Sequence, residues 1–348
     1  MSCAVILTAI PVEYMAVRSH LLELQEEVHD GGTIYERGKF VGNNSRSWDV
    51  GIVEVGAGNT GAAFEAERAI AYFKPSVVLF VGVAGGIKDV ALGDVVAATK
   101  IYGYESGKVQ EEFQPRPDVG ESAYNLIHRA RAEARKEDWL QRIKSPLGDR
   151  IPKVLVAPIA AGGKVIASRR SSVFKLIQSN YGDAVAVEME GRGFLQATHA
   201  SKQVDALVIR GISDLIDGKS RTDKAGWQEI AAYHASAFAF QILANLNHTN
   251  LQNLKSVDTP STASKLTGSR KREFTEALMD AFRSEKDLEM MLSYELDWKL
   301  NQVAGGDNYR EIVFNLIDYA EAQGQLGELL EAAKRDNPGN PMLGEFYL

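Results

Sequence analysis

The chain has 348 residues, 45% of them hydrophobic, and a net charge of −7, so it is long enough to bury a large core. The charge is uneven, because residues 269–348 hold nine Lys and Arg against sixteen Asp and Glu, while the first 268 residues hold thirty of each. A neutral body with an acidic tail argues against a general nucleic-acid-binding surface.

The first 248 residues alternate short apolar runs with amphipathic ones, which predicts an α/β domain with a mixed sheet flanked by helices. Strands are predicted over Cys3–Ala9, Thr33–Phe40, Ser47–Val55, Ser76–Val81, Gly93–Thr99, Lys153–Ala161, Ala184–Val187 and Ala206–Ile212. Helices are predicted from Pro11 to about Leu24, from the glycine turn at Gly56 to Phe73, and over Ser122–Ile143, Ser168–Asn180, Gly191–Ser201 and Trp227–Leu246. Residues 102–121 are polar, contain proline and are predicted to form a loop.

The remainder of the chain has a different character. Residues 249–268 are rich in Ser, Thr, Asn and Lys and are predicted to be a linker. Residues 269–348 have apolar positions spaced by three and four, which predicts a small all-α bundle. This region contains no His and no Cys, so no catalytic cluster is expected there. The predicted division is therefore a domain over 1–248, a linker over 249–268 and a helical domain over 269–348.

Composition also limits the cofactors and the compartment. The single cysteine, Cys3, excludes a disulfide framework and a cysteine metal site. The six histidines have no metal-ligand spacing, so a metal is not expected. No other cofactor is expected either. The N-terminus lacks the basic region of a signal peptide, and no run approaches the roughly 20 apolar residues that span a membrane. The cytoplasm is therefore the expected location.

A glycine-rich turn, Gly56-Ala-Gly58-Asn-Thr-Gly61, formally matches a dinucleotide-binding pattern between a strand and a helix. That interpretation requires an acidic residue at the end of the following strand, to hold a ribose. Here the following strand ends at Gly82. A dinucleotide site is therefore disfavoured.

Polar residues follow two of the apolar runs. Glu188-Met189-Glu190 comes after Ala184–Val187, and Ser213-Asp214 comes after Ala206–Ile212. A buried parallel strand is apolar throughout and has polar residues where it emerges, and ligands bind at those carboxyl ends. Acids at two such ends can face one ligand from two sides.

This pair of motifs resembles the nucleoside phosphorylase and nucleosidase superfamily, especially the adenosylhomocysteine/methylthioadenosine nucleosidase branch. The resemblance covers Val5 to about Leu246 and includes Glu13, the Gly82–Ile87 loop, Gly162–Ile166, Met189-Glu190 and Arg210-Gly-Ile-Ser-Asp214. It implies hydrolysis of the N-glycosidic bond of a purine nucleoside or nucleotide, with adenine favoured.

The resemblance also implies roles for individual residues. The acid matching Glu13 helps activate water, the acid matching Glu190 holds the ribose hydroxyls, and the acid matching Asp214 donates a proton to purine N7. Glu13 and Asp214 are therefore the expected catalytic residues. The expected substrate-binding residues are Gly85, Lys164, Val165, Ile166, Glu188, Met189, Glu190 and Ser213.

The chemistry requires these residue types independently. A carboxylate can stabilise the sugar cation, and the leaving purine needs an acid whose pKa is raised, which burial can supply. Structural interpretations compete: Glu13 and Glu190 could favour helix N-termini, and Asp214 could be a capping residue. Glu188 is expected to be the structural member of its pair, and Met189 could pack in the core.

The attacking group can be water or phosphate. Phosphorylases of this superfamily hold phosphate with an Arg ahead of the loop glycine and a Ser or Thr after it, but both places are apolar in Phe80-Val81-Gly82-Val83. Because a buried anion without donors is costly, hydrolysis is favoured, and a phosphorylase is the alternative. The cations Lys164, Arg169, Arg170 and Arg192 could hold 5′-phosphates, although a solvated helix face is the more ordinary interpretation of Arg169 and Arg170.

The tail resembles an effector-associated domain, a small helical module of bacterial conflict systems. The resemblance rests on Phe274–Phe282, Tyr309–Gln323 and Leu329–Pro341. It implies pairing with a similar helical domain on another protein, and hence a recruited or regulated effector in a setting such as antiphage defence. Two alternatives stay open: the tail is an oligomerisation module, or the first domain is a non-catalytic nucleotide sensor. The superfamily resemblance also implies at least a dimer.

Overall fold

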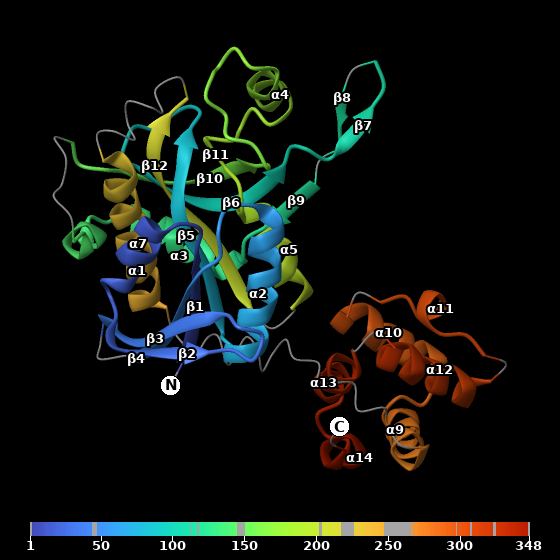
Figure 1. Cartoon of the computed structure of the whole chain (residues 1–348). Helices are drawn as coiled ribbons and strands as arrows, with labels where there is room; N and C mark the ends of the chain where they lie inside the picture. The colour runs from blue at the N-terminus through green and yellow to red at the C-terminus, as the bar shows by residue number, and fades with distance from the viewer. Residues whose placement is uncertain are drawn as a thin grey trace. The chain divides into compact units, whose positions relative to one another are not determined.

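The computed structural model describes residues 2–43, 47–111, 113–116, 118–144, 150–201, 204–216, 226–246, 266, 268–296, 298–306, 308–322 and 325–346. The chain divides into two compact units, Met1–His248 and Thr249–Leu348 (Figure 1). The first is a mixed α/β unit and the second is helical, so the predicted fold class is confirmed. Within the described part of the chain, no helix has both the length and the apolar character needed to cross a membrane.

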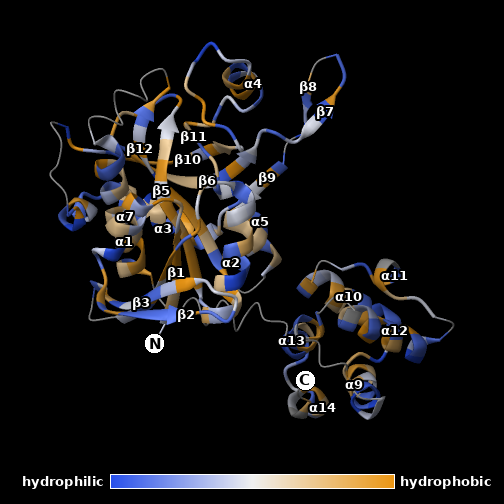
Figure 2. Ribbon diagram, viewed as in Figure 1, coloured by the Kyte–Doolittle hydropathy of each residue, from blue (hydrophilic) through white to orange (hydrophobic). Residues whose placement is uncertain are grey.

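The first unit is built on one mixed sheet of ten strands. These strands are β1 (Ser2–Thr8), β2 (Leu22–Val28), β3 (Ile34–Val41), β4 (Ser47–Glu54), β5 (Val77–Gly86), β6 (Val95–Gly103), β9 (Asp118–Glu121), β10 (Val154–Ala161), β11 (Ala186–Glu188) and β12 (Asp205–Leu215). A separate hairpin pairs β7 (Gly107–Val109) with β8 (Phe113–Pro115). Figure 2 shows the hydrophobic residues concentrated in the central strands, which are buried on both faces.

The strand order creates the place for a site. It runs β11-β10-β6-β12-β5-β1-β4-β3-β2, and β11 also pairs with the far end of β5. The five strands β5, β12, β6, β10 and β11 therefore form a closed ring of pairings. Gly85 of β5 is paired with Val187 on one neighbour and with Asp214 on the other. The polar ends of β11 and β12 are thus brought to opposite sides of one strand.

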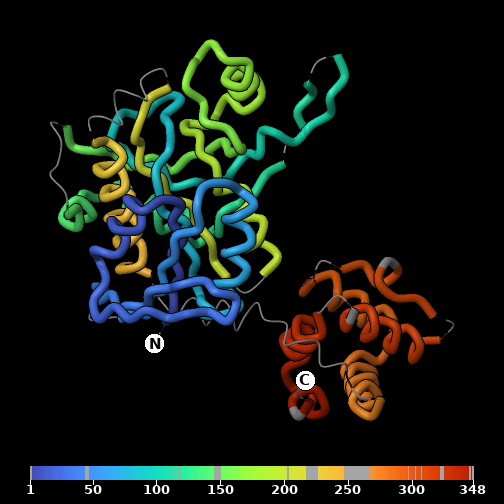
Figure 3. Tube along the Cα trace, in the orientation of Figure 1, coloured from blue at the N-terminus to red at the C-terminus, as the bar shows by residue number. Residues whose placement is uncertain are grey.

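Helices cover both sides of this sheet. The described helices of this unit are α1 (Pro11–Arg18), α2 (Asn59–Phe73), α3 (Tyr124–Ala134), the 3₁₀ helix η2 (Asp138–Arg142), α4 (Ser172–Asn180), α5 (Gly191–Ala200) and α7 (Trp227–Asn245). The helices α1 and α7 pack together, as do α2 and α5, and Figures 1 and 3 show the two pairs on opposite sides of the strands. Thirteen of the 19 residues of α7 are buried, mainly Ala and Phe, which makes it the central helix of its layer.

Two predicted elements are wrong. The first helix does not continue to Leu24 but ends at Arg18, and β2 follows it as an edge strand paired with β3. The predicted loop over 102–121 contains the end of β6, the β7–β8 hairpin and β9, which pairs with β6. Short polar strands of this kind are held by distant partners, and local composition does not reveal such pairing.

Other boundaries move. The helix predicted over Ser122–Ile143 is divided into α3 and η2, and α4 begins only after Ser171, whose side chain accepts the Phe174 N–H. The strands β5 and β12 continue past Val81 and Ile212 because they pair with each other beyond a bulge near Ile212. The predicted site residues at these places therefore lie within strands rather than after them.

The second unit contains α9 (Gly268–Ala281), α10 (Glu285–Leu296), α11 (Leu300–Val303), α12 (Tyr309–Ala322), α13 (Leu326–Asp336) and α14 (Pro341–Glu345) around one apolar core. Of the predicted linker over 249–268, residues 249–265 and 267 lie outside the described residues. Leu266 is buried in this core and donates its N–H to Glu321 at 2.7 Å. The helical unit therefore begins before the predicted position 269.

Candidate active site

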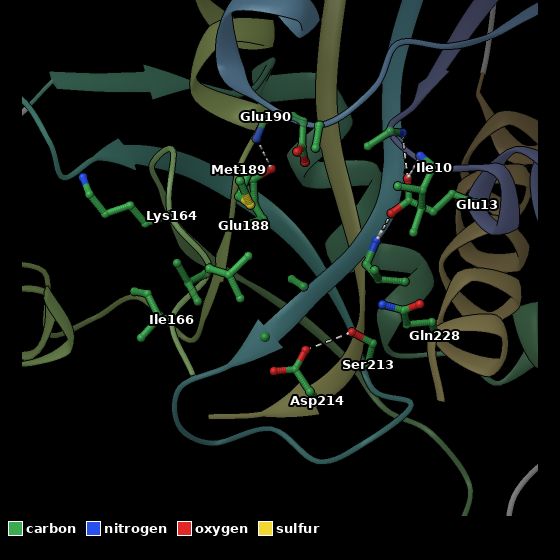
Figure 4. Close-up of a pocket in the computed structure, with 17 residues that line it drawn as sticks. Ile10, Glu13, Lys164, Ile166, Glu188, Met189, Glu190, Ser213, Asp214 and Gln228 are labelled. Atoms are coloured by element: carbon green, nitrogen blue, oxygen red, sulfur yellow. Dashed lines mark hydrogen bonds between the residues drawn. The ribbon is translucent and has the colours of Figure 1, made fainter. Parts of the chain in front are cut away.

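A cavity of about 270 Å³ lies beside the far end of β5, between the polar ends of β11 and β12 (Figure 4). Its volume is close to the lower end of the range for small-molecule pockets, about 300 Å³. Every site residue predicted from the sequence lines it: Glu13, Gly85, Lys164, Val165, Ile166, Glu188, Met189, Glu190, Ser213 and Asp214. The structure adds seven further lining residues, among them Ile10, Ala57 and Gln228. Sequence reasoning missed these three because they come from separate elements and carry no distinctive chemistry.

Glu13 lies in the first turn of α1 and is buried. One carboxylate oxygen accepts the N–H groups of Ala9 at 2.7 Å and Ile10 at 3.2 Å, and the other accepts the Val83 N–H at 2.8 Å. Burial raises the pKa of Glu13, although Arg210 and these backbone donors oppose the rise. Glu13 therefore both caps a helix and presents an unusually basic carboxyl group to the pocket.

Arg210 is the main residue that sequence reasoning did not place in the site. Its side chain on β12 is fully buried and donates to the carboxylates of Glu188 and Glu190, the second at 3.0 Å. Its guanidinium lies 4.5 Å from the centre of the Phe80 ring. A lone arginine inside an otherwise apolar strand could have predicted this cluster from the sequence, because a buried cation requires buried anions.

Gly82 shows how closely Arg210 and Glu13 are packed. A Cβ atom at position 82 would overlap both the Arg210 guanidinium and the Glu13 carboxylate. The glycine at the predicted end of this strand is therefore needed for space between two charged groups. Arg210 is thus surrounded by the carboxylates of Glu13, Glu188 and Glu190.

Glu188 has mainly a structural role, because its partners are backbone N–H groups and the buried Arg210. It accepts the N–H groups of Glu190 at 3.0 Å and Gly191 at 2.8 Å, at the start of α5, in addition to the Arg210 contact. Glu190 accepts the Gly58 N–H at 3.0 Å. The glycine-rich turn therefore binds a carboxylate of the protein itself. This agrees with the sequence analysis, which argued against a dinucleotide site at this turn.

Burial raises the pKa of Glu190 to about 7, with Arg210 lowering it and Glu188 raising it. The folded carboxyl group thus holds its proton more tightly than an unfolded one near 4.5. This contribution to stability is fully present below the unfolded pKa and is lost as the pH rises through about 7. Glu190→Gln removes this pH-dependent contribution. When the pH is raised from 5 to 8, the unfolding free energy of wild type should therefore fall by about 2–3 kcal/mol more than that of the variant. Urea unfolding at both pH values measures the difference.

The matched control for this experiment is Glu67→Gln, since Glu67 is exposed on α2. Its unfolding free energy should follow wild type at both pH values. Identical pH dependence of wild type and Glu190→Gln would contradict the raised pKa of Glu190.

Asp214 lies on β12 just past the bulge, and Ser213 donates to it from Oγ at 3.2 Å. It is buried inside a strand, and among the described residues it does not directly precede a helix. A Cβ at Gly85 would lie 3.2 Å from the nearer Asp214 oxygen. The absence of a side chain at position 85 therefore leaves room beside this carboxyl group.

Lys164, Val165 and Ile166 form the opposite wall, in the loop between β10 and α4. The Lys164 side chain points away from the acids in Figure 4 and pairs with Glu105. The other cations considered for 5′-phosphates do not line the cavity: among them, Arg192 pairs with Asp118, and Arg169 donates to the Ile87 carbonyl at 3.1 Å. Within the described residues, Lys164 is thus the one member of this group at the pocket.

A closed ring of strands with buried carboxylates at a small pocket defines an α/β protein built for a small polar ligand. The chain belongs to the Phosphorylase superfamily, whose family model matches residues 4–245. Residues 264–347 match the model of Effector-associated domain 1. Both family resemblances of the sequence are thereby confirmed.

Curated relatives are similar over the first unit. The chain is 29% identical over 248 residues to ATP nucleosidase Cap17 of Escherichia coli (strain KTE188), an alignment covering 63% of the chain and 47% of that protein. It therefore spans about half the length of that relative. It is 25% identical to a 5′-methylthioadenosine/S-adenosylhomocysteine nucleosidase of Glaesserella parasuis serovar 5 (strain SH0165), covering 62% of the chain and 86% of that protein.

Solved structures share the fold. The Streptococcus pneumoniae MTA/SAH nucleosidase in complex with 8-aminoadenine has 24% identity and a TM-score of 0.57, covering 71% of the chain and 100% of that protein. A futalosine hydrolase mutant of Helicobacter pylori strain 26695 has 20% identity and a TM-score of 0.57, with the same coverage of both chains.

Proposed function

We propose that the chain hydrolyses the N-glycosidic bond of a purine nucleoside or nucleotide, with adenine as the favoured base. The observation that carries this proposal is the meeting of Glu13, Glu190 and Asp214 in one small pocket. The relatives named as ATP nucleosidase and methylthioadenosine/adenosylhomocysteine nucleosidase support the same reaction class.

The three acids divide the work of the reaction. Glu190, held by the Gly58 N–H and Arg210, binds the ribose hydroxyls and stabilises the positive charge that develops on the sugar. Glu13, whose pKa is raised by burial, takes a proton from the attacking water. Asp214 gives a proton to the departing purine, and Ser213 orients its carboxyl group.

Water is favoured over phosphate as the attacking group. The Val83 N–H, a donor that an anion at the β5 end would use, is occupied by Glu13. The buried cation Arg210 pairs with Glu188 and Glu190 through Nη2 and does not line the cavity, so it is not placed to bind a phosphate there. A phosphate ion here would face Glu13, Glu190 and Asp214 with few donors left, and such burial is unfavourable.

The test is release of free adenine without phosphate. The purified chain is incubated with adenosine, methylthioadenosine, adenosylhomocysteine, AMP and ATP, and adenine is measured by chromatography. We expect adenine from at least one substrate, free ribose or its 5′-derivative as the second product, and the same rate after inorganic phosphate is added. A rate that requires phosphate, with a sugar 1-phosphate as product, would show a phosphorylase instead. The Cap17 relative makes ATP the first substrate to test.

The helical unit and the assembly complete the proposal. The match to Effector-associated domain 1 supports a protein partner, and we propose that this partner carries a similar helical domain and recruits or regulates the enzyme in antiphage defence. A reducing cytoplasm suits a chain with one cysteine. We also propose at least a homodimer, which light scattering on the full chain can check.

A further inference from the structure

The wall of the pocket opposite the acids is a loop, and its first residues are held by contacts with Glu188 and Glu105. It leaves β10 after Ala161 and reaches α4 at Ser172. The Gly162 N–H donates to the Glu188 carbonyl at 3.2 Å. The Gly163 N–H donates to a carboxylate oxygen of Glu105 at 2.7 Å, and the Lys164 ammonium pairs with the other oxygen. One carboxylate therefore binds two successive residues of the loop, directly before Val165 and Ile166.

The position of Glu105 is fixed by the buried residue that precedes it. It follows β6 and Tyr104, a buried side chain that packs against the same loop. A Cβ at Gly162 would overlap the Tyr104 ring, so the ring fills the space under the loop. Tyr104 also belongs to the apolar cluster that contains Ile166. The pair Tyr104-Glu105 thus holds the loop by packing and by hydrogen bonds together.

Glu105 is charged and lies outside the pocket. Although partial burial acts to raise its pKa, the Gly163 N–H and the Lys164 ammonium lower it overall. Glu105 lines a neighbouring cavity of about 670 Å³ and not the cavity of the three acids. It therefore acts on the pocket only through the residues that it holds.

We propose that Glu105 is a positioning residue for base recognition, which fixes the backbone of Gly163 and Lys164 so that Val165 and Ile166 present a preformed wall to the purine. This inference rests on the proposed function, because it assigns the loop to the base. Glu105 has no contact with Glu13, Glu190 or Asp214 among the described interactions. Its loss should weaken binding of the base and leave the chemical step nearly unchanged.

The experiment compares Glu105→Ala with Glu105→Gln in the full chain. Alanine removes both contacts, while the glutamine carbonyl still accepts the Gly163 N–H. We expect Glu105→Ala to raise KM and the adenine Kd about fivefold, the size of one lost hydrogen bond at an exposed side chain, with kcat within about twofold of wild type. Glu105→Gln should restore most of the affinity. The control Glu111→Ala, an exposed glutamate between β7 and β8, should match wild type.

Two further measurements make the result specific. Lys164→Met keeps the hydrogen bond from the Gly163 N–H to Glu105, so its effect should be smaller than that of Glu105→Ala. Equal effects would assign the role to the ion pair and overturn the role of the backbone hydrogen bond. Adenine binding by calorimetry separates this inference from the proposed function. A wild-type chain that binds adenine but releases none removes the function, and Glu105→Ala still tests the loop through Kd.

The proposal fails if Glu105→Ala has the KM and adenine Kd of wild type. It also fails if alanine and glutamine variants are equally impaired in kcat, since a positioning role predicts rescue by the conservative change. A wild-type chain without any affinity for adenine would contradict it as well.

Discussion

Asp214→Asn is expected to reduce adenine release by about 10²–10⁴-fold, the usual contribution of a general acid. Asparagine has nearly the same shape, its oxygen still accepts the Ser213 hydroxyl, and the space beside Gly85 accommodates it. An amide, however, has no proton to give to the leaving purine. Substrate binding and thermal stability should therefore remain close to wild type, and chromatography of free adenine over time measures the loss.

The matched control is Asp205→Asn, the same substitution at the opposite end of the same strand. Asp205 accepts the Asn125 amide at 2.7 Å, away from the pocket, and its variant should keep full turnover. An Asp214→Asn variant with more than half of wild-type activity would remove Asp214 as the acid. If wild type itself binds nucleotide without turnover and Asp214→Asn behaves identically, the first unit is a sensor.

Arg210→Met is expected to lower the free energy of unfolding by about 3–5 kcal/mol, the usual result of breaking a buried ion pair. Arg210 is fully buried, and its removal leaves Glu188 and Glu190 without their cation beside Glu13. The loss should be smaller at pH 5 than at pH 8, because protonation neutralises the abandoned carboxylates. Urea unfolding followed by tryptophan fluorescence measures it, since Trp48, Trp139 and Trp227 lie in the first unit.

The control for this prediction is Arg18→Met. Arg18 pairs with Glu36 at 2.7 Å, but its side chain is 39% exposed, so its loss should cost at most about 1 kcal/mol. Adding Glu190→Gln to Arg210→Met should recover part of the stability. Equal costs for the two arginine variants would mean that the buried cluster is already neutral without Arg210.

The sequence predicts more of the residues that form the site than of the strand pairings that surround it. Acids placed after two apolar runs are enough to predict that Glu190 and Asp214 meet at one pocket, because buried strands show polar residues where they emerge. The structure does place both at the cavity, together with Glu13 from the first helix. The roles of these residues in catalysis stay predictions.

What the sequence does not reveal depends on contacts between distant segments. The pairing of β11 with the far end of β5 joins residues about a hundred positions apart, and no local pattern reports it. The edge strand β2 and the β7–β8 hairpin have the local composition of a helix and a loop, since their pairing partners rather than their composition define them. The surroundings of Glu105 illustrate the same limit, because its hydrogen bond with the Gly163 N–H is visible only once both segments are folded.

The dependence of Arg210 on its surroundings bears on how members of this lineage diverge. Gly82 leaves space for the guanidinium, and Glu188 and Glu190 compensate its charge, so a change at any one of these positions is penalised until the others change too. A homologue that had lost catalysis would still need these four residues in order to fold stably. Retention of Arg210, Gly82 and Glu188 in a distant homologue is therefore weak evidence of activity, whereas, under the proposed function, replacement of Asp214 is the change that would identify a copy without activity.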